Sequence, residues 1–114
     1  MITAITSCTP VGSYIIVEGH AGPKHSVYSI FNTATESFET DIVGANLIFY
    51  GDDINTIVYS FWSDVYAYDG AVIASCELAE NEYISKLSFI DNNTQVQVTI
   101  EAENGSHTET VPLP

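Results

Sequence analysis

The side chains that could bind a metal ion lie in a few short stretches of this 114-residue sequence. The stretch HAGPKH places His20 and His25 in one predicted loop. A zinc site needs three or four ligands close together, and the remaining histidine, His107, is distant in the sequence, so we interpret the pair as exposed loop residues. Asp52 and Asp53 gather carboxylates in one turn, but the alternating acidic pattern of a calcium-binding loop is absent. We therefore expect no metal site and no cofactor.

Residues for nucleophilic or acid–base catalysis show no recognisable arrangement. The Gly-x-Ser-x-Gly motif of many hydrolases is missing, and neither Cys8 nor Cys76 stands next to a histidine in the sequence. No spacing singles out two of the fifteen acidic residues as a catalytic pair, and there is no arginine to hold a phosphate or carboxylate. We therefore predict that the protein is not an enzyme. We expect both cysteines to be buried free thiols, with a disulfide as the alternative if the protein is exported.

The charge of the chain is strongly one-sided. Fifteen acidic residues stand against only Lys24 and Lys86, which gives a formal net charge of −13. Such a surface repels nucleic-acid backbones and anionic lipids, so we expect neither direct nucleic-acid binding nor membrane binding. Three interpretations of the charge remain: it keeps a β-rich protein in solution, it attracts a basic protein partner, or it binds cations.

The N-terminal stretch MITAITSCTPVG has neither the basic region nor the long apolar run of a signal peptide. No segment approaches the roughly 18 consecutive apolar residues that a membrane-spanning helix needs. The cytoplasm is therefore the predicted location.

The sequence is typical of an all-β protein. Tyr, Val, Ile, Thr and Phe, which favour strands, are abundant, and apolar and polar residues alternate with a period of two. Tight-turn pairs such as Asp69-Gly70 and Asn104-Gly105 separate the alternating runs and favour antiparallel hairpins. This pattern predicts about eleven short antiparallel strands. Their residue ranges are 2–6, 13–19, 25–31, 37–43, 46–51, 55–62, 64–69, 71–78, 83–90, 94–103 and 106–113.

One sequence pattern occurs three times. An apolar strand runs into a polar turn in YIIVEGH, LIFYGDD and LSFIDNN, and a hairpin follows each of them. The clearest hairpin is VYAYDGAVIASCEL, with its turn at Asp69-Gly70. The chain therefore reads as a single all-β domain over residues 1–114 that contains three candidate repeats, at 13–43, 46–78 and 83–113.

These repeats resemble the blades of β-propeller proteins of the WD-repeat or kelch kind. The best copy is 46–78, with four predicted strands, although the Gly-His and Trp-Asp signatures of WD repeats and the Gly-Gly pair of kelch repeats are missing. The resemblance implies an incomplete, three-blade propeller, which is too small to close alone. It also implies a homodimer that closes a ring of six blades. The alternative folds are a β-sandwich or a barrel, for which a monomer is plausible.

The predicted function is a non-enzymatic binding or scaffold module. In this interpretation the acidic half-propeller self-associates into a closed ring and binds a protein or a small ligand. The alternative is an acidic inhibitor that mimics nucleic acid and occupies a groove of a basic partner. The candidate partner-binding residues are acidic turn residues and one exposed aromatic residue: Asp52, Asp53, Trp62, Asp69 and Asp91.

Aromatic residues crowd the middle of the chain. Because side chains alternate along a strand, Phe49, Tyr59 and Phe61 are expected to share one face, and we predict that they face the core. The other aromatic residues then lie on a second packed face or on the surface, where they would form a patch for a partner.

Overall fold

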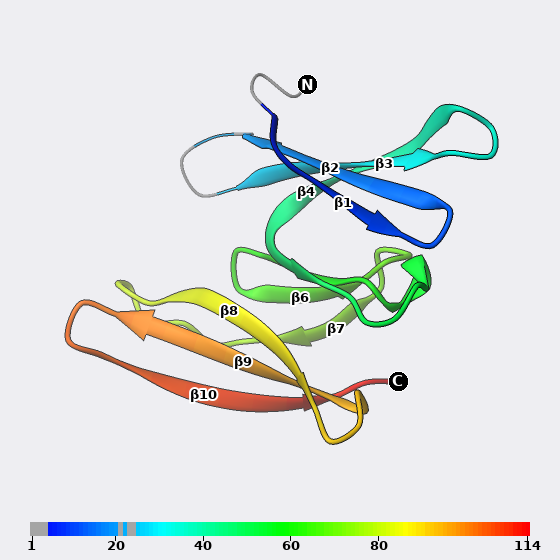
Figure 1. The fold of residues 1–114 in the computed structure, drawn as a ribbon. Coiled ribbons are helices and arrows are strands. Elements are labelled where there is room, and N and C mark those ends of the chain that lie inside the picture. The colour runs from blue at the N-terminus through cyan, green and yellow to red at the C-terminus, as the bar shows by residue number, and fades with distance from the viewer. Residues whose placement is uncertain (1–4, 21, 23–24) are drawn as a thin grey trace. The chain divides into compact units, whose positions relative to one another are not determined.

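The computed structural model describes residues 5–20, 22 and 25–114, and over these residues the protein is all-β, as predicted. Ten antiparallel strands form a seven-stranded sheet, in the order β1-β2-β3-β4-β5-β6-β7, and a three-stranded sheet, in the order β10-β9-β8 (Figure 1). Within the described ranges the one helix is a 3₁₀ turn at Ile54–Thr56, and no helix there is long and apolar enough to cross a membrane. The strands are β1 Ile5–Val11, β2 Tyr14–His20, β3 Ser26–Asn32, β4 Ser37–Ile48, β5 Val58–Phe61, β6 Asp64–Ala67, β7 Val72–Ser75, β8 Tyr83–Ile90, β9 Gln95–Ala102 and β10 Gly105–Pro112.

The prediction of eleven strands differs from the structure at two places. The strands expected at 37–43 and 46–51 are one twelve-residue strand, β4. The strand expected at 2–6 corresponds to β1, which runs from Ile5 to Val11, and residues 2–4 of that prediction lie outside the described residues. The two predicted ranges around β4 leave out Gly44 and Ala45, but the strand continues through these residues. Asn46, inside β4, has a positive φ of 58°. Its side-chain amide donates to Ser60 Oγ at 3.0 Å and to Ile84 O at 3.1 Å, which holds this unusual backbone conformation in place.

The chain folds as two compact units. The first contains β1 to β3, the beginning of β4 and the segment Gly51–Ile54; the second contains Asn46–Tyr50 and Asn55–Pro114. The buried apolar residues of the first unit are Val11, Ile16, Val27, Tyr28, Ile30, Ile42 and Ile54. In the turn between β1 and β2, Gly12 has a φ of 59°, and a Cβ at this position would lie 2.6 Å from Asp52 O. This turn therefore requires glycine for its backbone conformation and for the close approach.

The second unit has its own apolar core, to which both sheets contribute. Along β9 the residues alternate, so that Val96, Val98 and Ile100 are fully buried and the residues between them are partly exposed. This period of two is the pattern of a strand with one face against a core. The other buried members of the cluster are Val58, Val65, Cys76, Ile84 and Leu87.

The prediction that aromatic residues of β5 face the core was wrong for Tyr59 and Phe61. Val58 and Ser60 are the buried residues of this strand, while Tyr59 and Phe61 are only partly buried. Tyr59 instead stacks on Tyr66 of β6, its partner across the two strands, with ring centroids 5.4 Å apart. The prediction assigned the wrong set of alternate residues of β5 to the core. Because successive side chains point to opposite faces, an error of one residue exchanges the two faces.

On the other face of the three-stranded sheet, Tyr83 donates a hydrogen bond from its hydroxyl to Glu101 Oε2 at 3.1 Å. This bond and the negative charge of Glu101 raise the pKa of the Tyr83 phenol above its ordinary value of 10.0. Because the folded-state pKa is higher than the unfolded-state value, the stabilisation is fully present below the unfolded pKa and is lost as the pH rises through the folded pKa.

We expect Tyr83→Phe to lower the free energy of unfolding near neutral pH and to have no effect at strongly alkaline pH. Chemical denaturation of both proteins across this range measures the difference. A difference that stays constant into the alkaline range would show that the hydroxyl of Tyr83 does not stabilise the fold through Glu101.

Candidate functional site

The outer strand of the three-stranded sheet, β10, is the most exposed long strand of the second unit. It pairs with β9 in one uninterrupted register over its eight residues. Its first six residues, 105–110, are all exposed, and only Val111 and Leu113 near its end pack against the core. The strand order places β10 at an edge of its sheet. This edge is therefore open to solvent along most of its length.

The backbone of β10 offers hydrogen-bonding groups on this open side. In an antiparallel pair, residues that bond to the neighbouring strand alternate with residues whose N–H and C=O groups point away from it. Leu113 N donates to Thr94 O at 2.9 Å, so the odd-numbered residues of β10 face β9. The residues whose backbone groups point to the open side are therefore Ser106, Thr108 and Thr110. Pro112, which has no N–H, also falls on the open side, where proline is tolerated.

Two titratable side chains of β10 lie on the core-facing side of the sheet. His107 is paired with Ile100 of β9, and Glu109 is paired with Val98. Residues directly opposite each other in a pair point to the same face, so both polar side chains share the face of buried apolar residues. They occupy its rim, because the side chains of His107 and Glu109 are 51% and 46% exposed.

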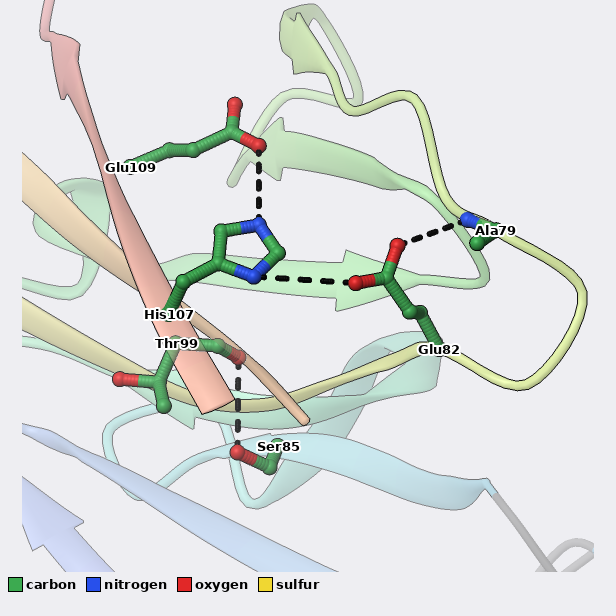
Figure 2. Close-up of polar contacts among 6 residues, drawn as sticks. All are labelled: Ala79, Glu82, Ser85, Thr99, His107 and Glu109. Carbon is green, nitrogen blue, oxygen red and sulfur yellow. Dashed lines mark hydrogen bonds and ion pairs between the residues drawn. The ribbon is translucent and has the colours of Figure 1, made fainter. Parts of the chain in front are cut away.

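His107 lies between two carboxylates (Figure 2). Its Nδ1 is 3.7 Å from Glu82 Oε2, and its Nε2 is 3.8 Å from Glu109 Oε2. These contacts are ion pairs only when the imidazole carries a proton on both nitrogens. These contacts therefore connect β10 with the segment that joins β7 to β8. A single imidazole can neutralise at most one of the two carboxylates, so the other keeps its negative charge.

A tight turn fixes the position of Glu82. Glu82 N donates to Ala79 O at 3.0 Å, and Glu82 Oε1 accepts a hydrogen bond from Ala79 N at 2.8 Å. The first hydrogen bond closes a four-residue turn, and the second joins the carboxylate of Glu82 to the first residue of this turn. Figure 2 shows that one oxygen of Glu82 faces Ala79 and the other faces His107. These bonds hold the carboxylate beside β10, where the side chain of Glu82 is 20% exposed.

Cys76 lies near the same group of charges. It is buried, and this burial, together with the negative charges of Glu109 and Asp64, raises the pKa of its thiol. A raised pKa reduces the thiolate fraction, so Cys76 is a poor nucleophile. Cys8 is also a free thiol, but it is exposed on β1, so the prediction that both cysteines are buried was wrong for Cys8.

We expect a small alkylating reagent to modify Cys8 at least about ten times faster than Cys76 in the native protein, because the buried thiol must first be exposed. Mass spectrometry after timed alkylation and proteolysis measures both rates. Addition of denaturant is the control and should make the two rates similar. Equal rates without denaturant would contradict the packing of Cys76 in the core.

Three or more His, Cys, Asp or Glu side chains arranged to hold a metal ion are not found in the described part of the chain. The thiol of Cys76 has a raised pKa, and the imidazole of His107 faces two carboxylates. What the site offers is an open strand edge with negative side chains beside it.

The residues predicted from sequence to bind a partner all lie in turns. Asp52 and Asp53 follow β4 and belong to the first unit. Trp62 precedes β6 and Asp69 follows it, so these two residues lie at opposite ends of that strand. Asp91 is in the turn between β8 and β9, with a φ of 53°.

Sequence reasoning did not identify Glu82, His107 and Glu109 as neighbours. The information was partly available, because His107, Glu109 and Val111 share one phase of β10, and the turn at Glu103-Asn104 sets the register with β9. The position of Glu82 was not predictable in this way, because it depends on the path of the connection from β7 to β8.

No family model matches the chain, and searches among curated proteins and among solved structures likewise find no match.

Proposed function

We propose that the protein is a non-enzymatic binding module for a basic protein partner. The observation that carries this proposal is the charge around the open edge of β10. Glu101, Glu103 and Glu109 lie on the β9–β10 hairpin, Glu82 lies beside it, and no lysine or arginine follows Lys86 in the sequence. A surface of one sign attracts partners of the opposite sign and speeds their encounter.

A binding titration with charged peptides tests this proposal. A fluorescent lysine-rich peptide should bind at low salt and be released as the salt concentration rises, whereas a glutamate-rich peptide should not bind. If both peptides bind equally, or if neither binds, the proposal is wrong.

A pair of charge-matched variants tests where such a peptide binds. We expect E103Q/E109Q to weaken binding about three- to tenfold, because exposed ion pairs are each worth up to about 1 kcal/mol. The control, E36Q/E39Q, removes the same charge from the hairpin between β3 and β4 of the first unit and should change the affinity by less than about twofold. An equal loss in both variants would mean that only net charge matters.

The nucleic-acid-mimicking inhibitor is a narrower form of the same proposal. It requires that the partner's basic surface is the one that binds nucleic acid. A complex with a basic partner that duplex DNA displaces competitively supports this form, and a complex that DNA does not displace contradicts it.

We also propose that the chain self-associates as a half-propeller, as a homodimer that closes a ring. What supports this is the order of the strands: β5 to β7 and the end of β4 follow one another as a meander within the candidate blade 46–78, and β8 to β10 form a second meander within 83–113. The test is the mass in solution by light scattering. A dimer is the expected result, and a strict monomer at high concentration would contradict the proposal.

A further inference from the structure

We propose that the open edge of β10 binds an extended, basic segment of a partner as an added antiparallel or parallel strand. The inference rests on the proposed function and names the site and the form of the partner. The proposal depends on the backbone groups of β10 and on the charged side chains beside them. The experiment below distinguishes strand addition from general attraction between opposite charges.

A comparison of the edge strands favours β10 over the others. Edge strands of natural proteins are protected against pairing by bulges, proline, charged side chains or short length. β1 has a register irregularity between Ile5 and Ser7 and contains Pro10. β7 has only four residues, and its pairing with β6 is irregular. β8 has an irregularity between Ile84 and Lys86.

β10 has none of these backbone devices before its last residue. Its register with β9 runs without interruption from Gly105 to Pro112, and proline occurs only at that end. Its exposed residues 105–110 include no lysine. Apart from Pro112, the only device on β10 that discourages pairing with another strand is the polar pair His107 and Glu109, whose side chains lie on the core-facing side of the sheet. These side chains disfavour an added apolar strand more than an added basic strand.

The open side of β10 provides regularly spaced backbone partners. Ser106, Thr108 and Thr110 each present one N–H and one C=O group, at every second residue along the strand. An added strand forms its hydrogen bonds at this spacing, and its side chains alternate between the two faces of the sheet. The side chains on one face then lie beside Glu109, and those on the other face lie beside Ser106 and Thr108.

The charges decide which strand fits. Lysine or arginine side chains on the face of Glu109 come within reach of both Glu109 and Glu82, where His107 neutralises at most one of the two carboxylates. At this edge a second copy paired through its own β10 is a poor occupant, because it would bring its own Glu82 and Glu109 against the same carboxylates. An extended basic segment satisfies both the backbone groups and the excess negative charge.

A single substitution on the open side tests strand addition. Thr108→Pro removes an N–H group that points away from β9, so the pairing with β9 should persist. We expect the affinity for a peptide of alternating lysine and valine to fall at least about tenfold, because one backbone hydrogen bond is lost and its neighbours are displaced. The control Thr108→Val keeps the N–H group and should bind within about twofold of the wild type.

A second measurement keeps the test independent of the stability of Thr108→Pro. A form of this lysine–valine peptide in which every backbone nitrogen is methylated has the same charge but cannot donate ladder hydrogen bonds. Strand addition predicts that it binds the wild-type protein at least about tenfold more weakly than the lysine–valine peptide. Equal binding of the two peptides overturns strand addition and leaves the proposed function standing. Failure of both peptides to bind overturns the proposed function itself.

Discussion

Replacing Ile100 by Ala is expected to lower the free energy of unfolding by about 3 to 4 kcal/mol, because it removes a large apolar side chain and leaves a cavity. Ile100 is fully buried in the core of the second unit, among residues from β5, β6, β8 and β9. Chemical denaturation followed by circular dichroism measures the loss. The effect should be a shift of the midpoint of the transition without a change in its slope.

Thr99→Ala on the same strand is the matched control. Thr99 is half-buried on the opposite face of β9. Its backbone oxygen accepts a hydrogen bond from Ser85 Oγ at 3.4 Å, which the substitution leaves in place. We therefore expect a loss below about 1 kcal/mol. Similar losses for Ile100→Ala and Thr99→Ala would mean that β9 does not turn one face to the core as described.

Asn46→Ala is expected to cost about 2 to 4 kcal/mol, since it combines strain at a positive φ with the loss of two partly buried hydrogen bonds. The side-chain amide of Asn46 joins β4 to Ser60 of β5 and to Ile84 of β8. The same denaturation experiment measures this cost.

Asn46→Gly separates the two causes. Glycine accepts a positive φ freely but has no amide, so this variant should lose only the hydrogen-bond contribution and be more stable than Asn46→Ala. If Asn46→Gly and Asn46→Ala are equally stable, the backbone at Asn46 is not strained. If Asn46→Gly is as stable as the wild type, the two hydrogen bonds do not contribute.

The strands of this protein were largely predictable because alternation and turn residues are local properties of the sequence. The range predicted for β8, 83–90, agrees with the structure, whereas the turn before β10 lies at Glu103-Asn104, one residue earlier than the predicted Asn104-Gly105 pair. The continuity of β4 was not predictable in this way. Gly44 and Ala45 weaken a strand locally, and their place inside β4 depends on pairing with neighbouring strands and on the hydrogen bonds of Asn46.

The candidate site was less predictable than the strands. Turn residues such as Asp69 and Asp91 are conspicuous in the sequence, but their type is explained by the turns themselves: Asp69 Oδ1 accepts a hydrogen bond from Ala71 N at 3.0 Å, and Asp91 has a positive φ. His107 and Glu109 stand in a strand, where polar residues attract little notice. Their significance comes from the register with β9 and from a contact with Glu82, which only the folded chain provides.

Amide hydrogen exchange along β10 tests whether this open strand edge is completed by a basic segment. In the free protein, we expect fast exchange at Ser106, Thr108 and Thr110 and slow exchange at the residues between them. At saturating lysine–valine peptide, these three amides should become protected, so that the alternation disappears. Continued fast exchange at all three, with the peptide bound, would contradict strand addition at β10.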